Sequence, residues 1–276
     1  MVSVPISSIS SYTPLVSIIT VCLNSEKFLE ETIRSVREQT YENIEYIVID
    51  GGSTDGTLDV IKKYEKDISY WISEPDKGIS DAFNKGVRLA NGDIIAILNS
   101  DDYYAHNRVV ERVVEIFTSQ PHIEMLYGKV RCVEQHTGKT LVIYGEPFSL
   151  KKMRKEIITP HPAIFAKREV YETVGLFSLE YKVCMDHEYF LRATTLFDPY
   201  FFDEILTIMR WGGYSTRNIY LAHREVYRTL RSNRVNMFIA LINLAYGYTM
   251  TTFSLLLQKV GFKRIVLLYR KWKGQL

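Results

Sequence analysis

Cysteine is scarce in this chain of 276 residues, and its distribution excludes two common kinds of site. The three cysteines, Cys22, Cys132 and Cys184, are scattered and form neither a CxxC pair nor a metal-ligand spacing. A disulfide framework and a cysteine-based zinc site are therefore not expected, and a reducing cytosol is the expected compartment. The N-terminus has no charged region followed by an apolar core, so no secretory signal is predicted.

Glycine-rich phosphate-binding loops are also missing. No GxGxxG sequence follows the first predicted strand, where residues 22–26 read Cys-Leu-Asn-Ser-Glu, and no GxxxxGK[ST] loop occurs in the chain. A dinucleotide fingerprint and a P-loop are thereby excluded. A nucleotide diphosphate bound by this chain needs another device, and the natural one is a divalent cation held by carboxylates.

Acidic residues are nearly absent from the C-terminal stretch. Residues 217–276 contain eleven Lys or Arg and one acid, Glu225, and so carry a net charge of +10. Because the whole chain carries only +2, the remaining residues carry −8. A basic tail on a mildly acidic body suggests a polyanionic surface as partner, either membrane or nucleic acid. The tail has no recognisable nucleic-acid-binding motif, and the acidic body argues against a nucleic-acid partner.

The first hundred residues do contain an alternation of strands and helices. Apolar runs of strand length alternate with segments whose apolar residues recur at helical spacing. Three such alternations predict an α/β fold with a parallel sheet wound by right-handed crossovers. The expected strands are 16–21, 45–50, 70–73 and 94–98, and the expected helices are 28–39, 57–66 and 78–90.

The second half of the chain is less regular, and it contains no internal repeat and no low-complexity linker. Its pattern still predicts short elements from apolar periodicity and from the positions of Gly and Pro. These are helices at 107–119, 150–157, 167–174 and 186–193, strands at 125–128, 163–166 and 205–211, and a hairpin within 129–143.

The strand at 94–98 ends abruptly in two carboxylates, in the sequence Asn-Ser-Asp-Asp at 99–102. Ligands of open α/β sheets bind beyond the carboxyl ends of the strands. Adjacent acids there repel each other unless they are solvated, hydrogen-bonded or paired with a cation. An ordinary polar turn has the same composition, since Asp caps turns well. Taken alone, the stretch fits a cation site and a polar turn equally well.

Four blocks of the first half, taken together, have a recognisable order and spacing. They are residues 16–24, residues 49–57 (Ile-Asp-Gly-Gly-Ser-Thr-Asp-Gly-Thr), residues 78–86 and residues 99–102. In these blocks the chain resembles the family 2 inverting glycosyltransferases of GT-A fold, of the bacterial exopolysaccharide or colanic-acid type. Residues 161–165 and 185–192 are similar to the acceptor-side segment of that family.

The resemblance covers residues 15–216 and implies a single Rossmann-like domain with a central, mostly parallel sheet flanked by helices. Residues 15–102 correspond to the nucleotide-sugar-binding half and residues 103–216 to the acceptor-side half. Residues 1–14 are expected to be a loose leader, and residues 217–276 a basic amphipathic helical tail.

The resemblance implies a hexosyltransferase that moves a sugar from a nucleotide sugar, usually a UDP-sugar, to an acceptor hydroxyl in polysaccharide or glycolipid biosynthesis. Asp50 then corresponds to the residue that hydrogen-bonds the nucleobase. The alternative is an inactive nucleotide-sugar-binding protein of the same fold, which a departure at Asn99 permits. The resemblance assigns to the donor Thr20, Val21, Leu23, Asn24, Asp50, Ser53, Asp81, Asn84, Lys85, Asn99 and Ser100.

The DxD motif of the family is matched at residues 99–101, with Asn99 in place of the first acid. An amide accepts a hydrogen bond but contributes no charge, so the divalent metal is assigned first to Asp101, with Asp102 in support. Few protein carboxylates combined with donor phosphate oxygens suit Mg²⁺, and Mn²⁺ is an equal candidate.

Asp186 matches the general base of the family. Inverting transfer needs a carboxylate that takes the proton from the attacking hydroxyl. Asp186 also opens a predicted helix, where a carboxylate caps well, so capping is the alternative role. Glu188 is the second candidate for the base, but residues two apart on a helix cannot share a face. Weaker assignments to the acceptor or to a mobile lid are His161, Glu188, Trp211, Gly212, Gly213 and Ser215.

Residues 235–258 carry no charge and are long enough to span a bilayer, although Asn236, Asn243 and Gly247 weaken that pattern. Both flanks are basic, so helices that lie in the membrane interface fit better. The expected location is cytoplasmic and peripheral, on an anionic membrane at the inner face of the cytoplasmic membrane, where a lipid-linked acceptor would be found. The alternative is a helical subdomain that packs on the enzyme or forms an oligomer.

Overall fold

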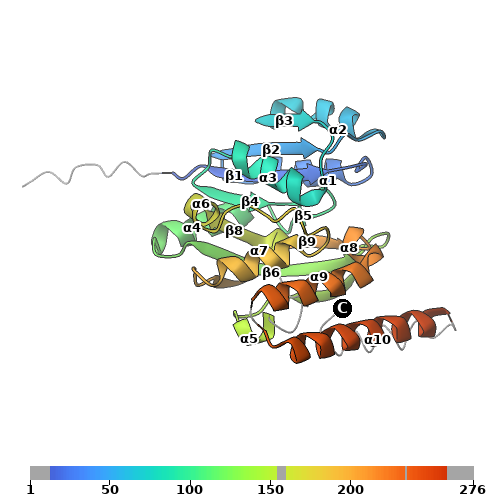
Figure 1. Ribbon diagram of the computed structural model, residues 1–276. Coiled ribbons are helices and arrows are strands. Elements are labelled where there is room, and N and C mark those ends of the chain that lie inside the picture. The colour runs from blue at the N-terminus through green and yellow to red at the C-terminus, as the bar shows by residue number, and fades with distance from the viewer. Residues whose placement is uncertain (1–12, 154–159, 234, 260–276) are drawn as a thin grey trace, which may run out of the picture.

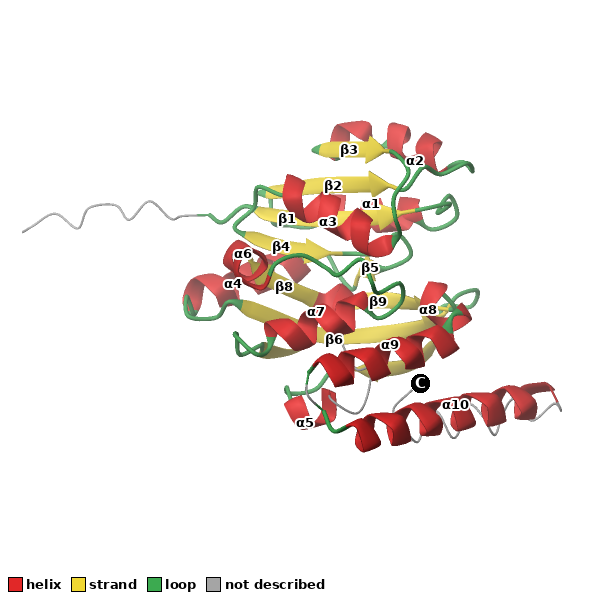
Figure 2. Ribbon diagram, in the orientation of Figure 1, coloured by secondary structure: helices red, strands yellow, loops and turns green. Residues whose placement is uncertain are grey.

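The computed structural model describes residues 13–153, 160–233 and 235–259. Within these ranges the chain forms one mixed sheet with helices on both faces (Figures 1 and 2). The predicted leader up to residue 12, the end of the predicted helix at 150–157 and residues 260–276 of the tail lie outside the described residues.

The strands follow one another across the sheet in the order β3-β2-β1-β4-β8-β6-β9-β5, and β7 pairs with β6. Their bounds agree with the predicted strands to within a few residues, except that β6 and β9 are longer and β5 was not expected. The strands are β1 Val16–Cys22, β2 Ile44–Asp50, β3 Tyr70–Ser73, β4 Ile94–Ile97, β5 Tyr103–Tyr104, β6 Met125–Glu134, β7 Thr140–Tyr144, β8 Ile164–Lys167 and β9 Tyr200–Trp211.

The predicted helices are confirmed where the structure describes them; a short helix, α8, precedes the tail, and the described part of the tail contains two more. The helices are α1 Leu29–Arg37, α2 Thr57–Lys63, α3 Ile79–Leu89, α4 Val109–Ser119, α5 Leu150–Met153, α6 Arg168–Val174, α7 Met185–Ala193, α8 Tyr214–Arg217, α9 Ile219–Ser232 and α10 Met237–Lys259. Short 3₁₀ turns occupy Glu65–Asp67 and His161–Ala163.

Strands β3, β2, β1 and β4 are parallel, as the alternation of strands and helices predicts. All seven residues of β1 are buried, which is typical of a parallel strand covered by helices on both faces. In the register of the sheet Cys22 lies beside Asp50 and Ile19 beside Ile97. Asp50 and residues 99–102 therefore emerge at the same edge, on either side of β1.

The acceptor half of the sheet is mixed, so the parallel order holds only for the first half. The pairs β4–β8, β6–β8, β6–β7 and β5–β9 are antiparallel, whereas β6–β9 is parallel. The predicted hairpin is β6 with β7, since antiparallel neighbours need only a short connection. Strand β5 follows the acid pair directly and is two residues long, too short to leave a pattern in the sequence.

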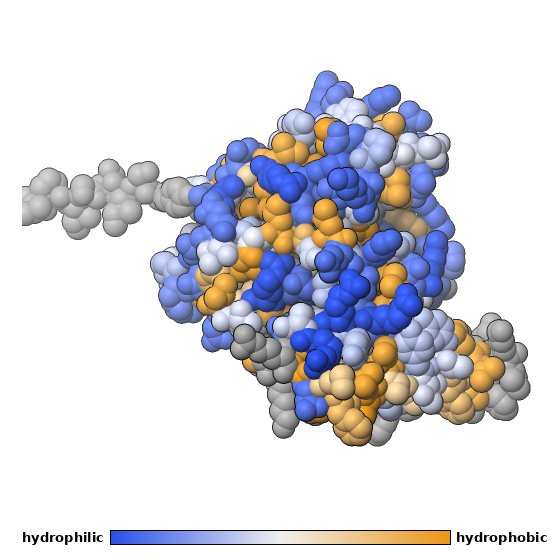
Figure 3. Space-filling model, in the orientation of Figure 1, coloured by the Kyte–Doolittle hydropathy of each residue, from blue (hydrophilic) through white to orange (hydrophobic). Residues whose placement is uncertain are grey.

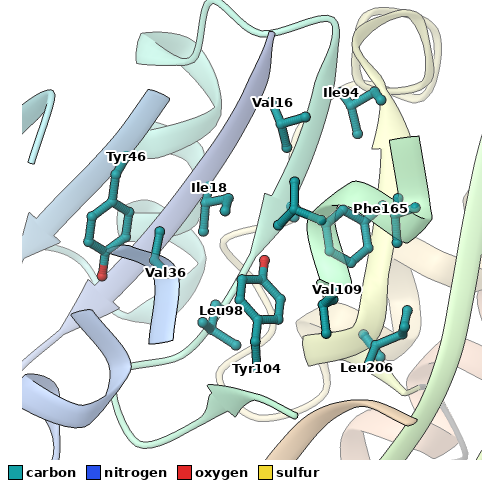
Figure 4. Packing of buried hydrophobic residues seen from close by; sticks show 14 of the residues in the cluster. Val16, Ile18, Val36, Tyr46, Ile94, Leu98, Tyr104, Val109, Phe165 and Leu206 are labelled. Carbon is teal, nitrogen blue, oxygen red and sulfur yellow. The ribbon is translucent and has the colours of Figure 1, made fainter. Parts of the chain in front are cut away.

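Alternate residues of β1 serve two apolar layers, one on each face of the sheet. Val16 and Ile18 pack in the layer that contains α1 and α4, and Ile19 and Val21 in the layer that contains α3 and α7. Figure 4 shows the first layer, in which Leu98 is completely buried. Burial of each such side chain contributes about 1.5–3 kcal/mol, so the backbone that leads into Asn99 is held by a rigid core.

The tail begins as part of this body and ends at its margin (Figure 1). Helix α9 buries Ala222, Val226 and Leu230 against Val183 and Cys184, the residues that precede α7. Helix α10 packs on α9, where the His223 ring is hydrogen-bonded to the Thr251 hydroxyl at 2.9 Å and the Tyr220 hydroxyl to that of Thr252 at 3.0 Å. Most of the apolar surface of α10 remains exposed.

Candidate functional site

The two acids that follow β4 are placed very differently from acids in an ordinary surface turn. Asp102 is only 1% exposed, and its Oδ2 accepts a hydrogen bond from the Asn99 amide at 3.2 Å. Its Oδ1 is buried and has no hydrogen-bond partner within the described residues. A buried carboxylate oxygen without a partner is costly, so this position calls for a cation or a proton.

The two carboxyls resist ionisation in this setting. Burial raises the pKa of Asp101, which the charge of Arg210 opposes. Burial also raises the pKa of Asp102 well above its usual range, and repulsion from Asp101 raises it further. A divalent cation would offset both the burial of the carboxyls and their mutual repulsion, because it favours the charged form of each carboxyl.

Arg210, at the end of β9, is a site residue to which the sequence patterns assigned no role. Its guanidinium lies 4.8 Å from the ring centre of Phe28 and 4.7 Å from that of Tyr103. It donates a hydrogen bond to the carbonyl of Asp101 at 2.5 Å and forms an ion pair with Glu31. Arg210 therefore ties β9 to the acid pair and supplies a positive charge beside it.

The loop that follows Arg210 lies directly over the acid pair. A Cβ atom on Gly213 would stand 3.3 Å from Oδ2 of Asp101, a tight contact, so the backbone of this loop lies close to that carboxylate. Gly212 has a φ of +117°, in the region that favours glycine. Trp211 is half-buried at the end of β9, and Ser215 is exposed on α8. The structure thus brings Gly213 to Asp101, while Ser215 points to solvent.

The residues at the end of β4 fit a divalent cation that also binds a ligand from solution. No group of three or more His, Cys, Asp or Glu side chains gathers at a metal-binding distance in the described part of the chain. Asp101 and Asp102 would hold the ion, with the remaining positions left to phosphate oxygens and water, as Mg²⁺ and Mn²⁺ accept. Ser100 turns away from them and pairs with the Ser25 hydroxyl at 2.8 Å.

Asp50 ends β2 and is completely buried. Its Oδ2 accepts hydrogen bonds from the amides of Gly52 and Ser53, at 3.1 and 2.9 Å, and from the Ser73 hydroxyl at 2.6 Å. The Ser53 hydroxyl donates to Oδ1. Burial acts to raise the pKa of Asp50, but these donors outweigh it and hold the pKa below its usual value. Asp50 thus fixes the turn that follows it.

The other residues predicted around the nucleobase are divided between core and surface. Thr20 is completely buried, and its hydroxyl accepts a hydrogen bond from Tyr46 at 3.1 Å, so it belongs to the core. Val21 is 8% exposed and packs in the layer with α3, whereas Leu23 is 55% exposed. The Asn24 side chain accepts a hydrogen bond from the Thr54 amide at 2.9 Å, which joins the loops after β1 and β2.

Helix α3 carries three predicted site residues: Asp81 and Lys85 lie together, whereas Asn84 contacts a different segment. Lys85 lies 2.8 Å from a carboxylate oxygen of Glu74 and 3.9 Å from one of Asp81, on the side of the β1–β2 loops. Asn84 is 97% buried, and its side chain exchanges two hydrogen bonds, of 2.9 and 2.8 Å, with the backbone of Phe177. Asn84 therefore holds the segment before α7 rather than facing the donor side.

Asp186 lies in the first turn of α7 and lines a small apolar cavity with His161, Phe177 and Tyr189. Its Oδ1 accepts a hydrogen bond from the His187 amide at 2.8 Å. Burial lowers the pKa of His161, so this imidazole is neutral at neutral pH. Its Nε2 is buried and has no hydrogen-bond partner in the part of the chain that the structure describes. One carboxylate and one neutral imidazole thus border a small, mostly apolar cavity.

Tyr144 of β7 is near enough to Asp102 and Asp186 for their charges to act on it, and no sequence pattern identified it. Burial raises its pKa well above the usual range, and the charges of Asp102 and Asp186 raise it further. Tyr144 is therefore a neutral phenol on which the charges of both carboxylates act.

Glu188, the second candidate for the base, is engaged in an ion pair. It forms an ion pair with Arg192 at 3.0 Å, and Arg192 also donates to the carbonyls of Val174 and Leu176. Glu188 and Arg192 thus pair one turn apart on the same helix.

Sequence comparison points to one family. The model of the glycosyl transferase family 2 matches residues 17–175, more than half of the chain. A Mycobacterium tuberculosis protein named an uncharacterized glycosyltransferase is 35% identical over 188 residues, which cover 67% of this chain and 71% of that protein. A PGL/p-HBAD biosynthesis glycosyltransferase of Mycobacterium bovis is 30% identical over 183 residues, covering 65% of this chain and 70% of that protein.

Solved structures share the fold. S. aureus TarS 1–349 in complex with UDP-GlcNAc has a TM-score of 0.60 and 20% identity, over 85% of this chain and 71% of that one. The mannosyltransferase PcManGT from Pyrobaculum calidifontis, in complex with GDP-Man and Mn²⁺, has a TM-score of 0.62 and 16% identity, over 96% and 88%. The match to a longer TarS chain spans 39% of that chain. The fold is GT-A, with an additional C-terminal helical tail.

The hydrogen bonds of Asp50 lead to a prediction on stability. Replacement Asp50→Asn should lower the free energy of unfolding by about 1–3 kcal/mol at pH 7, because an amide cannot accept from all these donors. The folded pKa lies below the unfolded value of about 3.9, so the stabilisation is present above that pH and is lost as pH falls through the folded pKa. Urea unfolding should therefore show a difference in the free energy of unfolding between wild type and Asp50→Asn at pH 7, and this difference should be smaller in acid. The exposed Asp198→Asn serves as control, and an equal loss at both pH values would contradict this role.

Proposed function

Because the chain belongs to glycosyltransferase family 2, we propose that it transfers a sugar from a nucleotide sugar to an acceptor hydroxyl with inversion at the anomeric carbon. Membership of the family makes the protein a glycosyltransferase; the donor, the stereochemistry and the residues that act are the proposal. The observation that carries it is the acid pair Asp101 and Asp102, in which Asp102 is buried and has one carboxylate oxygen unpartnered within the described residues.

The acid pair suits the diphosphate of a nucleotide sugar. When bound by Asp101 and Asp102, Mg²⁺ or Mn²⁺ supplies positive charge that neutralises the diphosphate as it leaves. Arg210 adds a fixed positive charge at the same place through its contact with the Asp101 carbonyl. Gly213 lets the loop after β9 lie against this group, which suits a lid that excludes water from the donor.

Asp186 serves as the general base in this proposal. The acceptor oxygen forms its bond to the anomeric carbon while the bond from that carbon to the diphosphate oxygen breaks, and the electron pair leaves with the diphosphate. The hydroxyl proton passes to the Asp186 carboxylate. His161, neutral and buried in the same cavity, offers a hydrogen-bonding nitrogen to the acceptor. The ion pair with Arg192 makes Glu188 the poorer candidate.

A uridine nucleotide is the proposed donor, in line with the UDP-GlcNAc complex of TarS. Val21, Leu23 and the turn after Asp50 would surround the base. Because the hydrogen bonds of Asp50 are already made, we assign it the role of shaping this pocket. A direct bond to a base N–H would require one of the present donors to move.

The proposed acceptor is a growing polysaccharide or a lipid-linked sugar, and the tail supports the lipid. Within the described residues one helix, Met237–Leu257, is long and apolar enough to cross a membrane, with a mean hydropathy of 1.3 and only 6% of its window buried. Hydrophobic residues gather over α10 in Figure 3. Helix α10 packs on α9 at the margin of the body. Its apolar residues are not confined to one face, so α10 is not the amphipathic helix that the sequence predicted, and its exposed apolar surface is what supports contact with a membrane. In this proposal residues 15–216 form the catalytic domain and residues 217–276 attach it to the membrane.

The role of Asp186 is tested by comparing the two acids of α7. Asp186→Asn should lower the rate of UDP release by about 10²–10⁴-fold, while donor affinity measured by calorimetry is preserved. Glu188→Gln is the matched control and should change the rate little. A screen of UDP-sugars with Mn²⁺ identifies the donor, and mass spectrometry identifies the products. An unchanged rate of UDP release in Asp186→Asn would refute its role as base.

Membrane attachment is tested on the exposed face of α10. Phe238 and Ile242 are 71% and 55% exposed. Because each would bury its side chain in the interface, Phe238→Asp with Ile242→Asp should reduce co-sedimentation with anionic phospholipid vesicles more than about tenfold. Leu196→Asp, at a 59% exposed leucine outside the tail, is the control. Undiminished sedimentation would exclude this surface, and a change in oligomeric state alone would favour the alternative of a helical interface between copies.

A further inference from the structure

Glu225 is the one acid in the basic stretch 217–276, and it points into the protein. It lies on α9 and is 4% exposed. Its Oε1 accepts a hydrogen bond from the amide of Lys182 at 2.8 Å. Its Oε2 accepts from the amides of Val183 and Cys184, at 2.9 and 2.8 Å. Three consecutive backbone N–H groups thus converge on one carboxylate.

These three amides belong to the residues that lead into α7, the helix that carries Asp186. Cys184 is the N-cap of α7, and its own side chain makes no capping hydrogen bond. The N-terminus of a helix carries partial positive charge and unpaired N–H groups, so a carboxylate binds there favourably. Glu225 therefore fixes from α9 the backbone of the three residues that lead into α7, the last of which is two residues before Asp186.

The same segment is held from its other side by α3. The Ser80 hydroxyl donates to the carbonyl of Tyr181 at 2.9 Å, and Asn84 pairs with the backbone of Phe177. Residues 177–184 are thus bound between α3, which carries Asp81 and Lys85, and α9. Of these two supports, only that from α9 reaches the residues directly before α7.

We propose that Glu225 is a positioning residue for Asp186, and that α9 is a structural part of the active site rather than only a link to the membrane. The proposal rests on the base role of Asp186. Without Glu225 the start of α7 loses three hydrogen bonds at the point where the direction of the helix is set. A displacement of a base by about 1 Å is enough to cost two orders of magnitude in rate. The donor groups on β4 and α3 do not contact Glu225 and should bind as before.

The test compares Glu225→Ala with Glu225→Gln, and uses Glu180→Ala as matched control. Glu180 lies in the same segment and faces α9, but it is exposed and pairs only with Arg228, at 3.6 Å. Glu225→Ala should lower kcat about 10–100-fold, with KM for the donor unchanged. Glu225→Gln keeps the volume and part of the hydrogen bonding and should fall between Glu225→Ala and wild type. Glu180→Ala should match wild type.

A second measurement separates positioning from a general loss of structure. In the Asp186→Asn background, Glu225→Ala should cause no further fall in kcat, because its effect passes through Asp186. Equal additional losses in both backgrounds would overturn the proposal, as would a raised donor KM with kcat preserved. If Glu225→Ala does not fold, Glu225→Gln takes its place in both backgrounds, and a wild-type kcat in that variant would overturn it. If Asp186→Asn itself leaves turnover intact, the proposed base is wrong. Because Glu225 is unchanged in that variant, this result separates a failure of the base assignment from a failure of the Glu225 proposal.

Discussion

Two adjacent carboxylates, one buried and one partly buried, follow β4, and the neighbouring residues offset the electrostatic cost of placing them there. Asp102 has one oxygen without a partner in the described ranges, and the pKa values of both acids are raised by burial. Arg210 reaches across from β9, held between Phe28 and Tyr103, and Gly213 allows the next loop to lie against Asp101. A polar turn would instead have exposed these acids to water. A cation at this place would favour the ionised form of both carboxyls.

The two halves of the chain meet through backbone hydrogen bonds more than through an interface of charged side chains. Helix α3 pairs through Lys85 with Glu74, in the loop after β3, and through Asn84 with Phe177, in the segment before α7, so one helix contacts both halves. Helix α9 completes the support of α7 through Glu225. The tail is thus joined to the catalytic body at its first long helix, and only α10 is left with an exposed apolar face. Helix α9 therefore links α10 to the segment that leads into the helix of Asp186.

The sequence predicted the features that depend on local pattern. Buried parallel strands, the acids at their ends and the helix that carries Asp186 follow from periodicity and from the position of charged residues. It could not predict contacts made by the fold. Thr20 was expected beside the nucleobase but turns into the core, because β1 is covered on both faces and alternate residues face opposite layers. Arg210, Tyr144 and Glu225 are separated in the sequence by tens of residues from the groups that they affect. From the sequence alone, Glu225 resembles an ordinary surface acid in a basic tail, and only the packing of α9 against the residues before α7 shows its role.

The central claim is that Asp101 and Asp102 hold a divalent cation on the diphosphate of the donor. Crystals grown with Mn²⁺ and UDP, measured at the manganese absorption edge, test it most directly. The account predicts an anomalous peak within bonding distance of a carboxylate oxygen of Asp101 or Asp102 and of phosphate oxygens. Bound UDP with no anomalous peak beside these residues would contradict it, as would a peak held by other side chains.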